Sequence, residues 1–261
     1  MRLLVCGSRE FTDVEYAIPR IHREHQKTPV TTLICGMARG GDMIGHAWAT
    51  ELGIPIDEFP IRPEDWDRHG NAAGPIRNMR MRDVGKPDLV LGLPGGNGTA
   101  NMLEIADAAG IRIIEFKYRY FSGARDPVDG YLSNFYQHNQ THDHIVYPSN
   151  EHWYQASKTL DPERRAWIWE SSTSGIAKKR GNHKSVVLRP DWETYKFEAM
   201  MTGLRQKFPK GSVLAERLLA TGDDYLVEYT RWNDRIWGVG TDKQGQNWLG
   251  RLLMRRRDEL V

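Results

Sequence analysis

The first 116 residues alternate between short apolar runs and segments with helical spacing, and this alternation restricts the fold more than any other feature of the chain. Apolar runs occupy residues 3–6, 32–35, 54–59, 89–93 and 111–116, whereas helical spacing is found at 14–25, 42–52 and 99–109. Strands that alternate with helices form a parallel sheet with helices on both faces. The sequence therefore predicts an α/β domain over residues 1–116.

Glycines directly follow three of these predicted strands, in the loops that begin at Gly7, Gly36 and Gly95. Ligands of parallel sheets bind beyond the carboxyl ends of the strands, where glycine lets backbone N–H groups approach a phosphate. Tight strand-to-helix turns also need glycine, so one such loop is weak evidence. Three at one sheet edge, with arginines nearby, favour nucleotide binding. The predicted nucleotide-binding residues are Gly7, Ser8, Arg9, Gly36, Arg39, Gly40, Gly41, Asp42, Arg77, Asn78, Gly95, Gly96, Gly98 and Thr99.

Composition restricts the class of protein and its compartment. The 261 residues suggest two domains, and the net charge of +2 provides no general field that would attract nucleic acid. The two cysteines, Cys6 and Cys35, both lie in apolar runs, which favours buried thiols over a disulfide. The N-terminal apolar run stops at Gly7, too early for a signal peptide or a membrane span. We therefore expect a cytoplasmic protein that makes no membrane contact.

The composition changes after Phe116, where aromatic residues become frequent. Seven tryptophans lie in this half: Trp153, Trp167, Trp169, Trp192, Trp232, Trp237 and Trp248. Core packing explains Trp167 and Trp169, whereas the others suit stacking on flat heterocycles. Carboxylates and amides lie among aromatic residues in the segments 132–136, 151–155, 233–238 and 246–250. Such surroundings desolvate carboxyl groups and raise their pKa values, which suits acid–base chemistry near neutral pH.

Residues 149–159 carry the most informative spacing in this half. Ser149 or Asn150 is suited to cap a helix in which Glu151 and Lys158 are seven residues apart. Together with Tyr154 and Gln155 they would form one stripe, with about 10 Å between its ends, enough for a small sugar. On spacing alone, an exposed glutamate and lysine on a surface helix is the favoured interpretation.

Three segments of the first domain resemble the SLOG superfamily: PGGNGT at 94–99, GMARGGD at 36–42 and AGPIRN at 73–78. The resemblance covers nearly all of residues 1–116 and implies a Rossmann-like parallel sheet that binds a nucleotide. Superfamily members that hydrolyse cytokinin riboside monophosphates carry a glutamate three residues after the threonine of the PGGxGT loop. Here that position is Met102, and Glu104 would point about 200° away on a helix. We therefore expect this domain to bind or sense a nucleotide.

Six segments of the second half resemble the NADAR or YbiA-like family and occur in the same order: residues 132–136, 149–158, 203–208, 221–229, 233–240 and 247–254. The resemblance covers nearly all of residues 117–261 and implies a mainly α-helical α+β domain with N-glycosidase activity. Some members are implicated in cleaving early riboflavin-pathway intermediates, and others remove ADP-ribose from guanine in DNA. We expect the latter activity, with a ribosylamino-pyrimidine hydrolase or a non-catalytic nucleotide sensor as alternatives. A homo-oligomer is compatible with the sequence.

The resemblance also implies roles for individual residues. It assigns the family's catalytic glutamate to Glu151, its motif lysine to Lys158, and its Asp-x-x-Trp pair to Asp234 and Trp237. The predicted catalytic residues are Glu151, Lys158 and Asp234, and the predicted substrate contacts are Asn134, Phe135, Tyr154, Gln155, Trp192, Trp237, Gly238 and Asn247. No cofactor or metal is expected. We further hypothesise that Lys158, with its pKa lowered by burial, forms a Schiff base with the opened ribose C1′.

Two polar stretches of the second half are open to more than one interpretation. Residues 137–147 contain His138, His142 and His144, which are able to bind metal, but no cysteine or carboxylate set accompanies them, and a solvated loop is favoured. The basic run at 175–184 either faces a phosphate or is a solvated loop.

Overall fold

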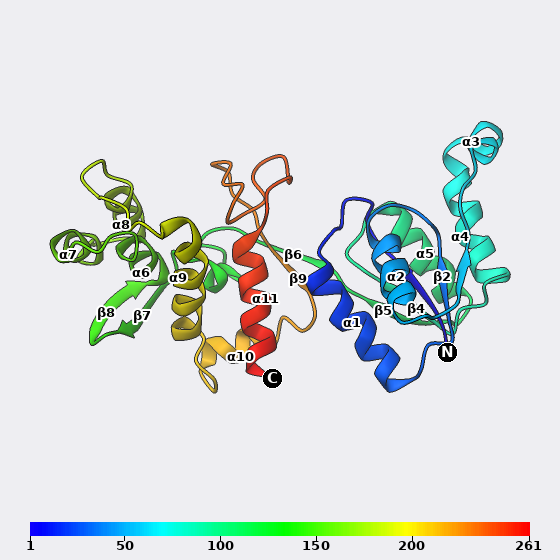
Figure 1. Cartoon of the computed structure of the whole chain (residues 1–261), viewed down its shortest axis with the longest axis horizontal. Helices are drawn as coiled ribbons and strands as arrows, with labels where there is room; N and C mark the ends of the chain where they lie inside the picture. Colours follow the sequence, from blue (N-terminus) through cyan, green and yellow to red (C-terminus); the bar gives the residue numbers. More distant parts are fainter. The chain divides into compact units, whose positions relative to one another are not determined.

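All 261 residues are described by a computed structural model, in which the chain forms two compact units, Met1–Tyr118 and Arg119–Val261. Figure 1 shows a sheet with helices in the first unit, and a mainly helical second unit. The division lies close to the boundary expected after residue 116. None of the helices combines the length and the apolar character needed to cross a membrane.

A five-stranded parallel sheet forms the centre of the first unit, in the order β3-β2-β1-β4-β5. Its strands are β1 Arg2–Cys6, β2 Thr32–Cys35, β3 Ile56–Glu58, β4 Leu89–Gly92 and β5 Arg112–Glu115. The helices are α1 Val14–Lys27, α2 Gly41–Glu51, α3 Pro63–His69, α4 Ala73–Asp83 and α5 Asn97–Ala108, with a 3-10 turn at Gly70–Ala72. This arrangement confirms the predicted α/β class. Helices α3 and α4 lie in a stretch for which the spacing predicts no element.

Both faces of this sheet are covered, which explains the continuous apolar runs of its strands. On one face, Met81 of α4 and Met102 of α5 pack against Leu4 and Val90 of the central strands. On the other face, α2 lies so close to β1 that a Cβ atom on Gly45 would come within 2.8 Å of the Val5 side chain. The cysteines are buried and unpaired, as predicted.

The second unit combines six helices with two small sheets. The helices are α6 Asn150–Ala156, α7 Pro162–Trp169, α8 Ser174–Gly181, α9 Trp192–Lys207, α10 Val213–Leu219 and α11 Trp248–Leu260. Strands β6 Tyr118–Phe121 and β9 Tyr225–Glu228 pair with each other, strands β7 Gln137–His142 and β8 Ile145–Ser149 form an antiparallel pair, and Gly130–Leu132 is a 3-10 turn. The helix α6 packs against α7, α8 and α9, and all of its residues are buried. This mainly helical α+β architecture agrees with the predicted class.

The hairpin β7–β8 corrects the expectation of a solvated loop over residues 137–147. His142 is buried, and its ring stacks on Trp153 with the ring centroids 3.8 Å apart and nearly parallel. Burial lowers the pKa of His142 to about 4, so the ring is neutral and behaves as an aromatic core residue. The structure contains no group of three or more His, Cys, Asp or Glu side chains arranged to hold a metal ion.

Candidate active site

Helix α6 places Glu151 inside the second unit. The helix is capped by Ser149, whose hydroxyl accepts a hydrogen bond from the backbone N–H of His152 at 3.4 Å. Helices α7, α8 and α9 pack against α6, and Glu151 is only 5% exposed. The interpretation of an exposed glutamate on a surface helix is therefore wrong.

Lys158 lies beyond the end of the same helix. Helix α6 ends at Ala156, so the helical stripe predicted for residues 151–158 does not reach the lysine. The chain nevertheless keeps Lys158 buried, at 8% exposure, with its Nζ atom 2.6 Å from Oδ1 of Asn182, to which it donates a hydrogen bond. The distance between the two predicted catalytic groups is thus set by tertiary packing rather than by two helical turns.

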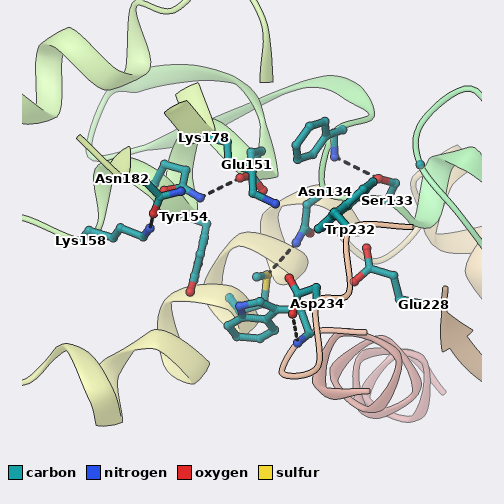
Figure 2. Close-up of a pocket in the computed structure, with 15 residues that line it drawn as sticks. Ser133, Asn134, Glu151, Tyr154, Lys158, Lys178, Asn182, Glu228, Trp232 and Asp234 are labelled. Atoms are coloured by element: carbon teal, nitrogen blue, oxygen red, sulfur yellow. Dashed lines mark hydrogen bonds between the residues drawn. The ribbon is translucent and has the colours of Figure 1, made fainter. Parts of the chain in front are cut away.

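A cavity of about 240 Å³ brings these side chains together (Figure 2). Its walls come from the loop before β7, from α6, α8 and α9, from the end of β9, and from the loop before α11. The lining residues are Gly123, Ser133, Asn134, Phe135, Glu151, Tyr154, Gln155, Lys158, Lys178, Asn182, Met200, Glu228, Trp232, Asp234 and Trp237. All three predicted catalytic residues are among them.

The burial of Glu151 and Lys158 shifts their pKa values in opposite directions. Burial raises the pKa of Glu151, although the hydrogen bond from Nε2 of Gln155 at 2.8 Å and two nearby lysines oppose that shift. Burial lowers the pKa of Lys158 to about 8. A carboxyl group that holds a proton more readily and an amine that releases one more readily are the groups required for proton transfer and nucleophilic attack near neutral pH.

Asp234 both shapes its loop and lines the cavity. Its Oδ1 atom accepts hydrogen bonds from the backbone N–H groups of Ile236, at 3.1 Å, and Trp237, at 2.9 Å. This turn directs the Trp237 ring edge-on toward Tyr154, with the ring centroids 5.3 Å apart. One carboxylate oxygen is thus used by the turn, and the other is available to a ligand.

The predicted substrate contacts fall into two groups. Asn134, Phe135, Tyr154, Gln155 and Trp237 line the cavity, whereas three others do not: Trp192, Gly238 and Asn247.

These three residues pack against residues that line the cavity, and their contact with the substrate stays a prediction. Trp192 is buried against Tyr154, with the ring centroids 5.3 Å apart. A Cβ atom on Gly238 would lie 2.7 Å from the carbonyl oxygen of Glu228. Asn247 accepts a hydrogen bond from the Glu228 N–H at 3.0 Å and donates one to the Leu226 carbonyl at 2.8 Å.

Several cavity residues were not predicted: Ser133, Lys178, Asn182, Met200, Glu228 and Trp232. Glu228 ends the apolar run Tyr225–Glu228, and a carboxylate at the end of a buried strand was the available signal. Lys178 belongs to the basic run at 175–184, most of which forms helix α8 rather than a loop. Its Nζ atom lies 5.0 Å from the Trp232 ring centroid and 5.7 Å from that of Phe135.

A second cavity, of about 590 Å³, lies at the carboxyl ends of the strands in the first unit. Nine of the residues predicted to bind a nucleotide line it: Gly7, Ser8, Arg9, Asp42, Arg77, Asn78, Gly96, Gly98 and Thr99. Gly36 and Arg39 line an adjoining hollow. Arg77 is 3.4 Å from the Asp42 carboxylate, whose pKa is raised by burial, and it also donates to the carbonyl oxygen of Gly36.

Gly40, Gly41 and Gly95 line neither space, and their role in ligand contact stays a prediction. They allow chain segments to approach one another. A Cβ atom on Gly41 would lie 2.5 Å from Cα of Gly7, and one on Gly95 would lie 2.1 Å from Oγ1 of Thr99, while Gly40 adopts a φ of +80°. Met102 is buried in the core, and Glu104 is exposed outside the cavity.

Comparison with known proteins identifies both units. The family model of the NADAR domain matches residues 120–261, and that of the YspA, cpYpsA-related SLOG family matches residues 1–69. The chain belongs to the NADAR family. The resemblances to the SLOG and NADAR families are thereby confirmed, and with them the assignment to a family of N-glycosidases.

Proteins similar to this NADAR family member include the N-glycosidase YbiA of Escherichia coli, which is 40% identical over 132 residues, covering 51% of this chain and 82% of YbiA. An N-glycosidase of Nostoc punctiforme is 34% identical over 134 residues, or 50% of this chain and 85% of the relative. A riboflavin biosynthesis protein of Vibrio vulnificus is 37% identical over 135 residues, or 52% of this chain and 36% of the relative. The NMR structure of E. coli YbiA superposes with a TM-score of 0.52 at 37% identity, covering 56% of this chain and 86% of YbiA.

Proposed function

We propose that the second unit hydrolyses the bond between ribose C1′ and an amino nitrogen, and that its substrate is ADP-ribose attached to guanine in DNA. The observation that carries the proposal is the pairing of buried Glu151 and Lys158 in one cavity, with pKa values shifted toward neutral pH. At about 240 Å³ the cavity is smaller than the roughly 300–1,000 Å³ typical of drug-sized ligands. It therefore suits the sugar and the bond to be cleaved rather than a whole dinucleotide.

The chemistry follows from the exocyclic nitrogen of the substrate. A ribosylamine opens its ring to an imine, because the nitrogen lone pair forms the C1′=N bond as the C1′–O4′ bond breaks. The neutral amine of Lys158 then attacks C1′, and Glu151 gives a proton to the departing amino group. Water adds to the new C1′=N bond with Lys158 and releases the sugar. Asp234 binds a ribose hydroxyl or shares these proton transfers, and Trp237 stacks on the substrate.

The edge of the cavity favours a substrate attached to a nucleic acid. Trp232 lines the cavity, yet it is 57% exposed, with the Lys178 ammonium group near its ring. An exposed indole and a lysine suit a base and a phosphate of a DNA strand. The alternative substrates are early riboflavin-pathway ribosylamino-pyrimidines, because relatives from Vibrio vulnificus and Zea mays are named as riboflavin biosynthesis proteins.

A direct assay separates these substrates. The full chain is incubated with guanine-ADP-ribosylated DNA, with the free ADP-ribosylated nucleoside and with the riboflavin intermediates, and the products are identified by mass spectrometry. We expect release of ADP-ribose, fastest from the DNA. Faster turnover of the pyrimidines would show that they are the substrate, with the same type of reaction. Absence of turnover with all three would contradict the proposal.

The first unit is proposed to bind a nucleotide, with its phosphate at the loops that carry Arg9 and Gly96. Arg9→Ala is expected to weaken binding of ADP-ribose roughly tenfold or more, because a charge-assisted hydrogen bond contributes about 1.5–3 kcal/mol. Arg80→Ala is the control, since Arg80 is exposed on α4 outside the cavity. Titration calorimetry measures both; equal losses would contradict a specific role. Nucleotide binding here without any turnover by the second unit would favour the sensor alternative.

A further inference from the structure

Glu228 is a cavity carboxyl group that the mechanism above does not use. It is the last residue of the buried strand β9, its side chain is 9% exposed, and it lines the same cavity as Glu151 and Asp234. Its backbone is held on both sides, by the hydrogen bond to Asn247 and by one from the Val239 N–H to its carbonyl oxygen at 2.9 Å. Figure 2 shows the carboxyl group turned toward the side of the cavity where Asp234 lies.

No protein group donates a hydrogen bond to the carboxyl oxygens of Glu228, and no cation lies within ion-pair distance of them. A buried, ionised carboxylate without such partners is costly. The carboxyl group is therefore either protonated in the free protein or ionised and able to accept a hydrogen bond from a substrate hydroxyl. In both cases it is a polar group that contacts a ligand in the cavity.

The charges around Glu228 come from four elements. Asp234 of the following loop and Glu151 of α6 raise its pKa, whereas Lys178 of α8 and Lys207 of α9 lower it. Burial is the largest effect, and the pKa rises to about 8. Lys207 is itself fully buried, with its Nζ donating to the Ser133 carbonyl oxygen at 2.7 Å and its pKa lowered by burial to about 7. This raised pKa favours the protonated form of Glu228 at neutral pH.

Ring opening requires such a proton. When C1′–O4′ breaks, the bonding electrons go to O4′, which needs an acid, while the exocyclic N–H loses its proton to a base. A carboxyl group that gives its proton to O4′ and a second one that takes the N–H proton place an acid and a base at two separate atoms. Two carboxyl groups with different surroundings divide such roles in other enzymes.

Resting on the N-glycosidase function proposed above, we propose that Glu228 is the catalytic acid of ring opening. The Glu228 proton moves to O4′, which becomes the 4′-hydroxyl as C1′–O4′ breaks. The nitrogen lone pair forms C1′=N, and the N–H proton moves to the Glu151 carboxylate, which later returns it to the departing amine. When the released sugar closes its ring, the 4′-hydroxyl proton goes back to Glu228, so protons and electrons balance over the cycle.

The test compares Glu228→Gln with the unaltered chain, using the substrate that the unaltered chain turns over. Glutamine keeps the shape of the side chain but cannot transfer the proton, so we expect kcat to fall by roughly 10²-fold or more with KM changed only a few-fold. The pH profile gives the second readout. Activity of the unaltered chain should pass through a maximum near pH 8, rising as Lys158 loses its proton and falling as Glu228 loses its own, and Glu228→Gln should lack this alkaline fall. The rise of activity with deprotonation of Lys158 should persist in both.

Two further variants keep the inference falsifiable. Glu198→Gln, on the exposed side of α9, should match the unaltered chain. Glu228→Asp keeps a proton donor. This variant should recover part of the kcat that Glu228→Gln loses, and its activity should again fall at alkaline pH. The comparison with the unaltered chain holds even if Glu228→Gln is unstable. A drop in kcat that leaves the alkaline fall in place would assign Glu228 a structural role and overturn the inference. If the unaltered chain has no turnover, the proposed function itself fails.

Discussion

Glu151→Gln is expected to lower kcat for ADP-ribose release by roughly 10²- to 10⁴-fold, the range that a positioned general acid–base group contributes. The carboxyl group is buried, accepts a hydrogen bond from Gln155 and has a raised pKa. A glutamine at this position still has an oxygen for the Gln155 hydrogen bond but cannot carry a proton to the leaving amino group. Chromatographic measurement of released ADP-ribose under saturating substrate gives kcat, and substrate titration gives KM.

The control for this prediction is Glu163→Gln, because Glu163 is an exposed residue of α7 and does not line the cavity. It should keep the activity of the unaltered chain. Thermal unfolding should give similar melting temperatures for both variants, since each replacement is close in volume. If Glu151→Gln stays folded and retains more than about a tenth of the activity, the catalytic role assigned to Glu151 is wrong, because acid–base catalysis contributes more than that.

Lys158→Met is expected to reduce turnover by more than roughly 10³-fold, as loss of a covalent nucleophile does in hydrolases. Borohydride added during turnover should reduce the Schiff base of the unaltered chain and leave the sugar attached to the Lys158 peptide. Lys158→Arg keeps the positive charge but cannot form an imine, so this variant should also give no sugar adduct with borohydride. Intact-protein mass spectrometry followed by peptide mapping measures the adduct. Lys179→Met is the control, because Lys179 is the exposed lysine next to the cavity residue Lys178.

The pH dependence of trapping has a definite sign. Only the neutral amine attacks C1′, and burial lowers the pKa of Lys158 to about 8. The trapping rate should therefore rise as the pH increases toward about 8, well below the range in which an exposed lysine becomes neutral, and fall again where Glu228 loses the proton needed for ring opening. Undiminished turnover with no adduct would indicate direct attack by water with Glu151 as base. Lys158 would then be a contact for a phosphate or hydroxyl group.

Local sequence patterns were sufficient to predict most elements of the first unit. Apolar runs between segments of helical spacing define β1, β2, β4, α1 and α5, because strand and helix periodicities are properties of consecutive residues. Local patterns also predicted that the glycine loops after the strands lie together, since the carboxyl ends of parallel strands meet at one edge of the sheet. Local patterns were weaker for α3 and α4, where apolar residues are sparse.

The hairpin β7–β8 shows where local patterns failed. Its strand Gln137–His142 is polar throughout, so neither period nor composition distinguishes it from a loop. What stabilises it is His142 stacked on Trp153, a residue of another element. Such a contact depends on the position of α6, which no local pattern encodes.

By itself, the sequence determined the two units, their fold classes and the identity of Glu151, Lys158 and Asp234 as candidates, because local periodicity and family motifs are written along the chain. The tertiary structure decided that these three residues line one cavity together with Glu228. It also decided that Trp192 and Asn247 contact residues that line this cavity. The physical reason is burial. A pKa and a cavity wall depend on which distant segments exclude water from a side chain, and only the packed fold sets that exclusion.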